Sequence, residues 1–96
     1  MAKKDKAELA LEVTQLIIDK LNITHVTADK VNITTPLFSE ENELELDSID
    51  AIEIVVELQK TYGVRINDEL PTREILYSIE SLTDFLIKEN ATEKIG

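Results

Sequence analysis

The fold is decided by residues 46–63, LDSIDAIEIVVELQKTYG, which hold more apolar side chains than one buried helix face needs. At roughly 100° of rotation per residue, one set of apolar positions forms a stripe that would face a core. These positions are Ala51, Ile54, Val55, Leu58 and Tyr62. Two further stripes complete the helix surface: an apolar one of Ile49, Ile52 and Val56, and an acidic one of Asp50, Glu53 and Glu57.

The second apolar stripe has two interpretations. It packs beneath a loop or a short helix, or it stays partly exposed and docks a partner. An apolar strip beside acids suits docking, since the strip supplies contact area and the acids steer a basic partner.

The remaining sequence predicts an all-α fold, a small four-helix bundle with three long helices and one short helix. Residues 5–22 repeat apolar side chains at three- and four-residue spacing, and residues 79–89 do so after a capping Ser78. Residues 47–62 form the second helix, ended by Gly63, and Pro71-Thr72 opens the short one. The first two helices are joined by a long loop, residues 23–46, held down by its apolar side chains: Val26, Val31, Ile33, Leu37, Phe38, Leu44 and Leu46. We expect one domain over residues 1–96, with an ordered core of about 5–89.

The composition and charge of the chain limit the classes of molecule that it is expected to bind. The formal net charge is −10, and no Lys or Arg lies between Lys30 and Lys60. Such a surface repels phosphate backbones, which argues against nucleic acid, although an acidic run also serves simply as a solubilising face. There is no cysteine, no apolar run of about 18 residues to span a membrane, and no apolar core after the N-terminal lysines. We therefore expect a cytoplasmic protein, and a monomer.

The start of the second helix places Ser48 between acids. Asp47 or Ser48 is a suitable N-cap, and capping is the ordinary role of a serine there. The alternative is covalent attachment, because free N–H groups and the helix dipole at an N-terminus favour an anion such as a phosphate.

Residues 46–66 resemble the second-helix region of acyl carrier proteins. Asp47-Ser48-Ile49 matches the Asp-Ser-Leu core of that family, and Tyr62-Gly63-Val64 matches its aromatic-Gly-hydrophobic turn. The last helix, SIESLTDFLIKEN, is also similar, whereas the first helix agrees mainly in placement and length.

The resemblance implies that Ser48 receives 4′-phosphopantetheine from coenzyme A, and that the arm carries acyl intermediates as thioesters for fatty acid or polyketide biosynthesis. Asp47 would support attachment by a phosphopantetheinyl transferase. The other implied partners are acyl-activating, ketosynthase or acyltransferase enzymes with basic patches. These would dock on the second apolar stripe and the acidic stripe: Ile49, Asp50, Ile52, Glu53, Val56 and Glu57. The space between helices would shelter the acyl chain.

Some positions depart from the family pattern. Glu45 stands where the family often has glycine, Ile49 replaces the usual leucine, and Gln59 and Lys60 stand where many members carry acids. These departures suggest a standalone carrier of a specialised pathway, such as polyketide or aryl-polyene assembly. The competing hypothesis is an unmodified acidic helical adaptor that binds a basic protein.

The sequence offers no catalytic constellation and no metal-ligand cluster. His25, the single histidine, is expected to be an exposed loop residue, and nothing in the pattern orients it towards Ser48 as a general base. We therefore expect a protein that is not an enzyme.

Overall fold

The computed structural model describes residues 5–40, 42, 44–66 and 72–89, and the regular elements in these ranges are all helical. In chain order they are α1 (Lys6–Lys20), the 3-10 turn η1 (Ala28–Lys30), α2 (Ser48–Tyr62), α3 (Thr72–Ile75) and α4 (Ile79–Lys88). The all-α class, with three long helices and one short helix, is confirmed. Pro71, predicted to open the short helix, lies outside the described residues. Within the described ranges, no helix combines the length and apolarity that crossing a membrane requires.

Polar side chains set the helix ends. The Asp5 carboxylate accepts a hydrogen bond from the Glu8 amide at 2.7 Å and caps α1. Ser78 caps α4 as predicted, through a reciprocal pair of bonds with Ser81. Gly63 ends α2 with a φ of 68°, a left-handed conformation that costs glycine little because it has no Cβ.

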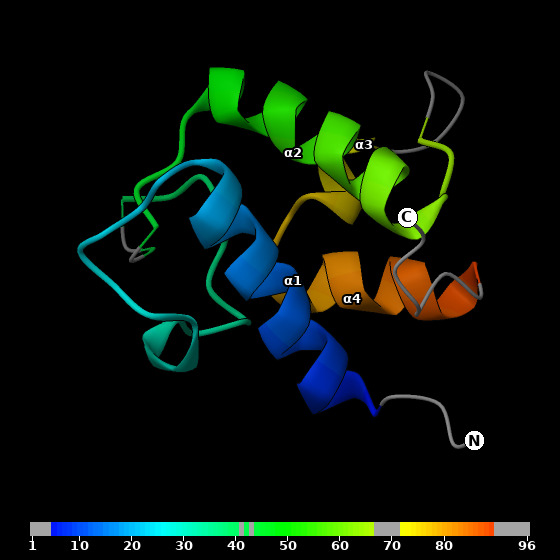
Figure 1. Ribbon diagram of the computed structural model, residues 1–96, viewed down its shortest axis with the longest axis horizontal. Helices are drawn as coiled ribbons and strands as arrows, with labels where there is room; N and C mark the ends of the chain where they lie inside the picture. Colours follow the sequence, from blue (N-terminus) through cyan, green and yellow to red (C-terminus); the bar gives the residue numbers. More distant parts are fainter. Residues whose placement is uncertain (1–4, 41, 43, 67–71, 90–96) are drawn as a thin grey trace.

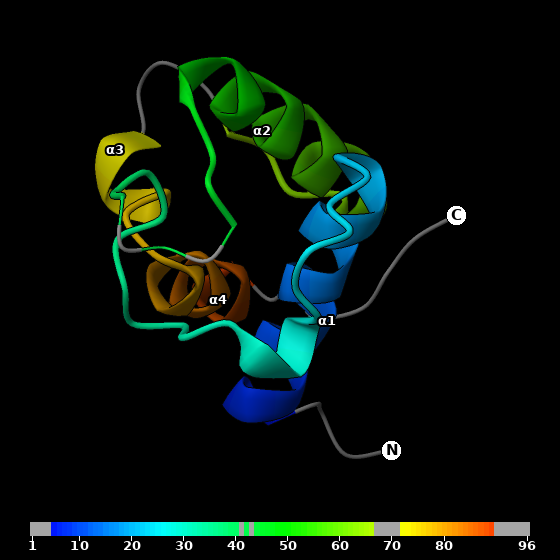
Figure 2. The same ribbon diagram turned by 90° about the vertical axis from the view of Figure 1, so that its left-hand side faces the viewer.

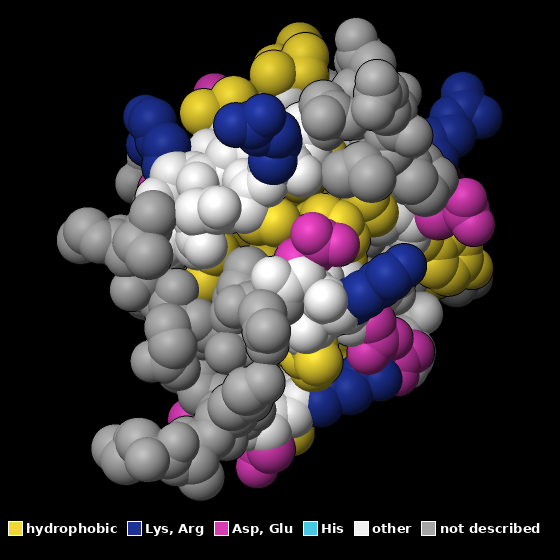
Figure 3. All heavy atoms as spheres, turned by 90° about the vertical axis from the view of Figure 1, so that its right-hand side faces the viewer, with side chains coloured by type: hydrophobic (Ala, Val, Ile, Leu, Met, Phe, Trp, Pro, Cys, Tyr) yellow, Lys and Arg dark blue, Asp and Glu magenta, His cyan; other side chains and the backbone are white. Residues whose placement is uncertain are grey.

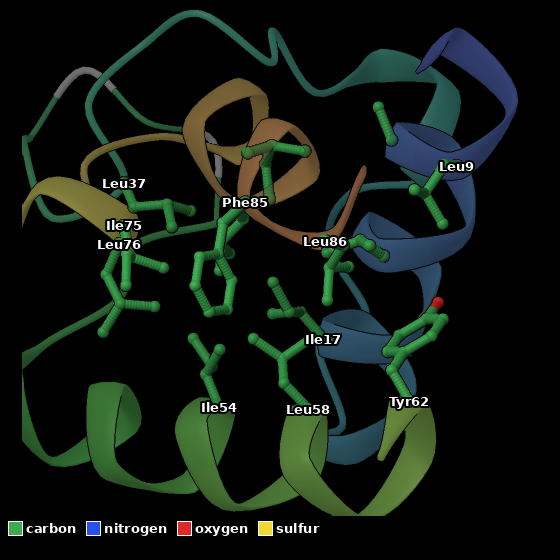
Figure 4. Close-up of a cluster of buried hydrophobic side chains, with 14 of the residues drawn as sticks. Leu9, Ile17, Leu37, Ile54, Leu58, Tyr62, Ile75, Leu76, Phe85 and Leu86 are labelled. Atoms are coloured by element: carbon green, nitrogen blue, oxygen red, sulfur yellow. The ribbon is translucent and has the colours of Figure 1, made fainter. Parts of the chain in front are cut away.

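The long helices surround one apolar core. Figure 1 shows α2 above α1 and α4, and Figure 2 shows the three around a common centre, with α3 at one edge. Figure 4 shows Ile54 and Leu58 pointing from α2 towards Phe85 and Leu86 of α4. Ile54 and Leu58 are buried, and burying each such side chain stabilises the fold by about 1.5–3 kcal/mol. Ala51 and Val55, also predicted to face the core, are only half-buried.

Among the described residues, a hydrogen bond and an ion pair join α1 to α2. The Tyr62 hydroxyl donates a hydrogen bond of 2.8 Å to Glu12 Oε1, and Lys20 Nζ lies 3.3 Å from Glu57 Oε1. Burial, and then the hydrogen bond to Glu12 and its negative charge, raise the pKa of the Tyr62 phenol well above its usual value. The phenol therefore remains a hydrogen-bond donor throughout the physiological pH range.

The long connection between α1 and α2 is fixed by backbone hydrogen bonds to the C-terminal half of the fold. The Leu37 amide donates to the Tyr77 carbonyl at 2.7 Å, and the Glu80 amide donates to the Ile33 carbonyl at 2.9 Å. Leu37 is buried, as predicted, but Phe38 is exposed. The connection thus brings residues 36–39 beside the segment that follows α3, which Figure 2 shows from the side.

Candidate functional site

Helix α2 begins with a capping box made by Asp47 and Asp50. Asp47 Oδ1 accepts hydrogen bonds from the amides of Ile49 and Asp50, both at 3.0 Å. In return, Asp50 Oδ2 accepts a hydrogen bond of 3.0 Å from the Asp47 amide. The structure thereby decides which of the two candidate residues caps the helix: Asp47 does, and Ser48 is the first helical residue.

The capping box leaves the Ser48 hydroxyl unused. Ser48 is exposed, and its side chain forms no hydrogen bond with any residue that the structure describes. Asp47 therefore does the capping that a serine at this place would ordinarily do. A solvent-accessible oxygen at the mouth of a helix is open to covalent modification by another protein.

The same capping box limits how well the N-terminus of α2 can bind an anion. An N-terminus favours a phosphate through its free N–H groups, but the amides of Ile49 and Asp50 already donate to Asp47. An anion on Ser48 would also meet the negative charges of Asp47 and Asp50. The helix N-terminus alone is therefore a weaker anion site than the sequence suggested.

The turn into α2 holds Glu45 in a left-handed conformation, with a φ of 53°. Non-glycine residues adopt this conformation at a cost of roughly 1–2 kcal/mol. The Glu45 carboxylate lies 3.2 Å from His25 Nε2, and both side chains are exposed. The turn keeps the conformation that suits glycine, and His25 is an exposed loop residue whose ring contacts Glu45.

A cavity of about 660 Å³ opens beside Ser48. Its volume falls in the range of pockets that hold small organic ligands, roughly 300–1,000 Å³. The connection, the start of α2 and the α3 segment all contribute to its walls, which are largely apolar. The described lining residues are Pro36, Phe38, Ser39, Ser48, Ala51, Thr72, Arg73, Leu76 and Tyr77.

Sequence reasoning did not assign Phe38, Arg73 or Tyr77 to the site. Phe38 was expected to hold the loop down, and Arg73 and Tyr77 belong to a segment too short for its periodicity to show a face. Only the tertiary contact between residues 36–39 and the α3 segment brings these side chains together. No local pattern in the sequence carries that information.

The second apolar stripe of α2 is exposed. The exposed fractions are 69% for Ile49, 66% for Ile52 and 43% for Val56, whereas Ile54 on the core side is 3% exposed. A shallow groove of about 260 Å³ runs beside the stripe, between α2 and α3, and Ile52 and Val56 line it. In Figure 3 hydrophobic side chains protrude at the upper edge, the height at which Figure 1 places α2. Below them, basic and acidic side chains are intermixed.

The three acids of α2 occupy different environments. Asp50 belongs to the capping box and is half-buried, whereas Glu53 is exposed and forms no ion pair with a described residue. Glu57 accepts a hydrogen bond from Thr61 and pairs with Lys20, so its side chain is only 19% exposed. The acidic stripe is therefore most accessible at Glu53.

No cluster of three or more potential metal ligands occurs among the described residues. The Ser48 hydroxyl also has no hydrogen bond to the ring of His25, the partner that an activated serine would need. In its described part, the site holds an exposed serine beside a largely apolar cavity.

Comparison with known proteins identifies relatives of the same size. Residues 12–86 match the family described as "Phosphopantetheine attachment site". An acyl carrier protein of Rubrobacter xylanophilus is 31% identical over 84 residues, which cover 88% of this chain and 94% of the relative. An acyl carrier protein of Syntrophobacter fumaroxidans is 29% identical over 87 residues, covering 91% of this chain and 98% of the relative.

Proposed function

This chain belongs to the phosphopantetheine-attachment family of acyl carrier proteins, and we propose that Ser48 is the residue that bears its arm. Proteins of this family are carriers rather than catalysts, and their prosthetic group is 4′-phosphopantetheine attached to a serine. When bound, the group supplies a terminal thiol that holds acyl groups as thioesters. A chain without cysteine would obtain its only thiol in this way.

The observation that carries the proposal is that Asp47, and not Ser48, caps the start of α2. Ser48 is exposed, and its side chain has no described hydrogen-bond partner. Both capping bonds end on Asp47 Oδ1, and Oδ2 accepts none from the described residues. Asp47 therefore retains a carboxylate oxygen with which to assist a transferase, the role we propose for it.

The residues around Ser48 also fit an attached arm. Ser48 lines the cavity of about 660 Å³, whose apolar wall includes Phe38 and Leu76. We propose that this cavity shelters the apolar part of the arm or of its acyl cargo, where apolar surface would be removed from water. Cargo of the fatty acid or polyketide type suits such a lining, and a carrier of a specialised pathway, such as polyketide or aryl-polyene assembly, is the assignment we favour.

Partner enzymes, in this proposal, dock on the exposed stripe of α2. Ile49, Ile52 and Val56 supply apolar contact area, and Glu53 supplies the most accessible negative charge beside them. A partner with a basic patch would be steered by this charge and held by the apolar contact. Such partners include the phosphopantetheinyl transferase and the acyl-activating, ketosynthase or acyltransferase enzymes of the pathway.

Asp50 and Glu57 have a smaller part in docking than Glu53. Asp50 holds the helix cap, and Glu57 already pairs with Lys20. We further propose that the carrier acts as a cytoplasmic monomer and that residues 1–96 form one domain.

The test is intact-mass measurement after incubation with coenzyme A and a phosphopantetheinyl transferase of broad specificity. The wild-type chain is expected to gain one phosphopantetheinyl group, and Ser48→Ala to gain none. Ser39→Ala is the matched control, because Ser39 lines the same cavity but donates its hydroxyl hydrogen bond to the Pro36 carbonyl at 3.0 Å. This control should load like the wild type.

The competing hypothesis, an unmodified acidic adaptor, predicts no mass gain in any of the three proteins. Loading that persists in Ser48→Ala would place the arm on another residue and would overturn the assignment of Ser48.

A further inference from the structure

A phosphodiester on Ser48 would place a negative charge where the structure offers little to balance it. The first-turn amides of Ile49 and Asp50 are already bonded to Asp47. The carboxylates of Asp47 and Asp50 lie on either side of Ser48 in the sequence, and the nearest basic residues in that sequence are Lys30 and Lys60. Any compensating charge must therefore come from another part of the fold.

The cavity beside Ser48 supplies a compensating positive charge. Among its described lining residues, which include Ser48, Arg73 of α3 is the single charged side chain. Arg73 is exposed, and it forms no ion pair with a residue that the structure describes. A guanidinium on a largely apolar wall is thus available to an anion that enters from Ser48.

We propose that Arg73 binds an anionic oxygen group brought into this cavity by the arm on Ser48. The inference rests on the proposed function, since it needs the arm. A guanidinium suits this task because its planar set of N–H donors matches two oxygens of a phosphate or carboxylate at once. Arg73 is then a binding residue that orients the arm along the cavity, and the arm begins from a fixed direction instead of moving freely in solvent.

Two anions of the loaded carrier share this chemistry. One is the phosphodiester of the arm, present in every holo protein. The other is the free carboxylate of a half-acid cargo, present only when a dicarboxylic acyl group is attached as its monothioester. The phosphodiester is the source we favour, because it adjoins Ser48, which lines the same cavity as Arg73.

The experiment compares the wild type with Arg73→Gln and Arg65→Gln in four forms: apo, holo, holo loaded with an acetyl group, and holo loaded with a malonyl group. Arg65 is the matched control, since it is the only other arginine, is exposed, and is not among the described residues that line the cavity. The readouts are the thermal midpoint of each form and the ³¹P chemical shift of the phosphodiester. Intact mass establishes that each protein carries its arm.

We compare the thermal midpoint of the holo form with that of the apo form in each protein. Relative to Arg73→Gln, this difference in the wild type should be shifted upwards by about 1–5 °C, as one exposed ion pair would give. This shift should shrink at 1 M salt, where the screening length is about 3 Å. The ³¹P signal should move in Arg73→Gln and stay in place in Arg65→Gln. A merely structural role for Arg73 would alter the apo midpoint and leave the phosphorus signal unchanged.

Each result has one meaning. An Arg73 effect that appears on conversion to the holo form supports the phosphodiester, and an effect that appears only with the malonyl group supports the cargo carboxylate. If Arg73→Gln and Arg65→Gln respond alike in every loaded form, the inference is wrong while the carrier function stands. A wild-type chain that accepts no arm would overturn the proposed function, and this inference with it.

Discussion

Two isoleucines of α2, two residues apart, should differ sharply in what they contribute to stability. Ile54 is 3% exposed and points into the core in Figure 4, whereas Ile52 is 66% exposed. Replacing each by alanine removes the same atoms from the same helix. The comparison therefore isolates burial from side-chain chemistry and from helix position.

The expected losses follow from these exposures. Truncating a buried isoleucine to alanine costs about 2–5 kcal/mol, through lost transfer energy and the cavity left behind, so Ile54→Ala should lose this amount. About a third of Ile52 is covered, and full burial is worth about 1.5–3 kcal/mol, so its contact contributes about 0.5–1 kcal/mol. Alanine returns a few tenths of a kcal/mol through its higher helix propensity. Ile52→Ala should therefore lose between about 0 and 1 kcal/mol.

The assay is urea unfolding at 25 °C followed by circular dichroism, which gives the free energy of unfolding of each variant. The slope of that free energy against urea concentration is also compared between variants. In thermal melts, Ile54→Ala should lower the midpoint by at least about 8 °C, since 1 kcal/mol corresponds to about 4–8 °C in a domain of this size. Leu58→Ala, at a residue that is 0% exposed, is the second core control and should resemble Ile54→Ala. Equal losses at Ile52 and Ile54 would refute the assignment of the two apolar stripes.

The remaining predictions concern single polar residues. Tyr62→Phe should cost about 1–2 kcal/mol at pH 7, because it removes the hydrogen bond to Glu12. The folded-state pKa of Tyr62 is raised, so the phenol's contribution is fully present below its unfolded pKa of about 10 and is lost as the pH rises above that value. Urea unfolding between pH 9 and 12 should therefore show a shallower alkaline decline in Tyr62→Phe, and an unchanged decline would contradict this. Glu45→Gly should raise stability by about 0.5–1 kcal/mol in the same assay, by relieving the left-handed strain, while Glu45→Ala, which keeps a Cβ, should give no gain. Glu53→Lys should slow loading by a basic transferase about threefold or more at low salt without lowering the thermal midpoint, whereas Glu57→Lys should also lower it by breaking the ion pair with Lys20. Loading rates of Glu53→Lys that equal the wild-type rates at low ionic strength would argue against electrostatic steering.

Local pattern was enough to predict the helices, because a helix is built from contacts three and four residues apart. The spacing of Ile54, Leu58 and Tyr62 predicted the core face of α2, and all three are buried. The caps were readable for the same reason, since a capping side chain bonds within its own first turn. The family could also be recognised from the sequence, because its motif lies within a single helix and the turn that follows it.

The sequence by itself therefore determined the all-α class, the two apolar stripes of α2 and the kinship with acyl carrier proteins. Only the tertiary structure decided which features share a site. The pairing of Glu57 with Lys20, and the cavity that Arg73 and Phe38 line beside Ser48, join segments far apart in the chain. Such contacts depend on how whole elements pack, and no periodicity within one element encodes them. The cap of α2 is a local feature, but Asp47 and Ser48 are both residues that can cap a helix, so the sequence left the choice open. The structure shows that Asp47 Oδ1 accepts the hydrogen bonds from the first-turn amides.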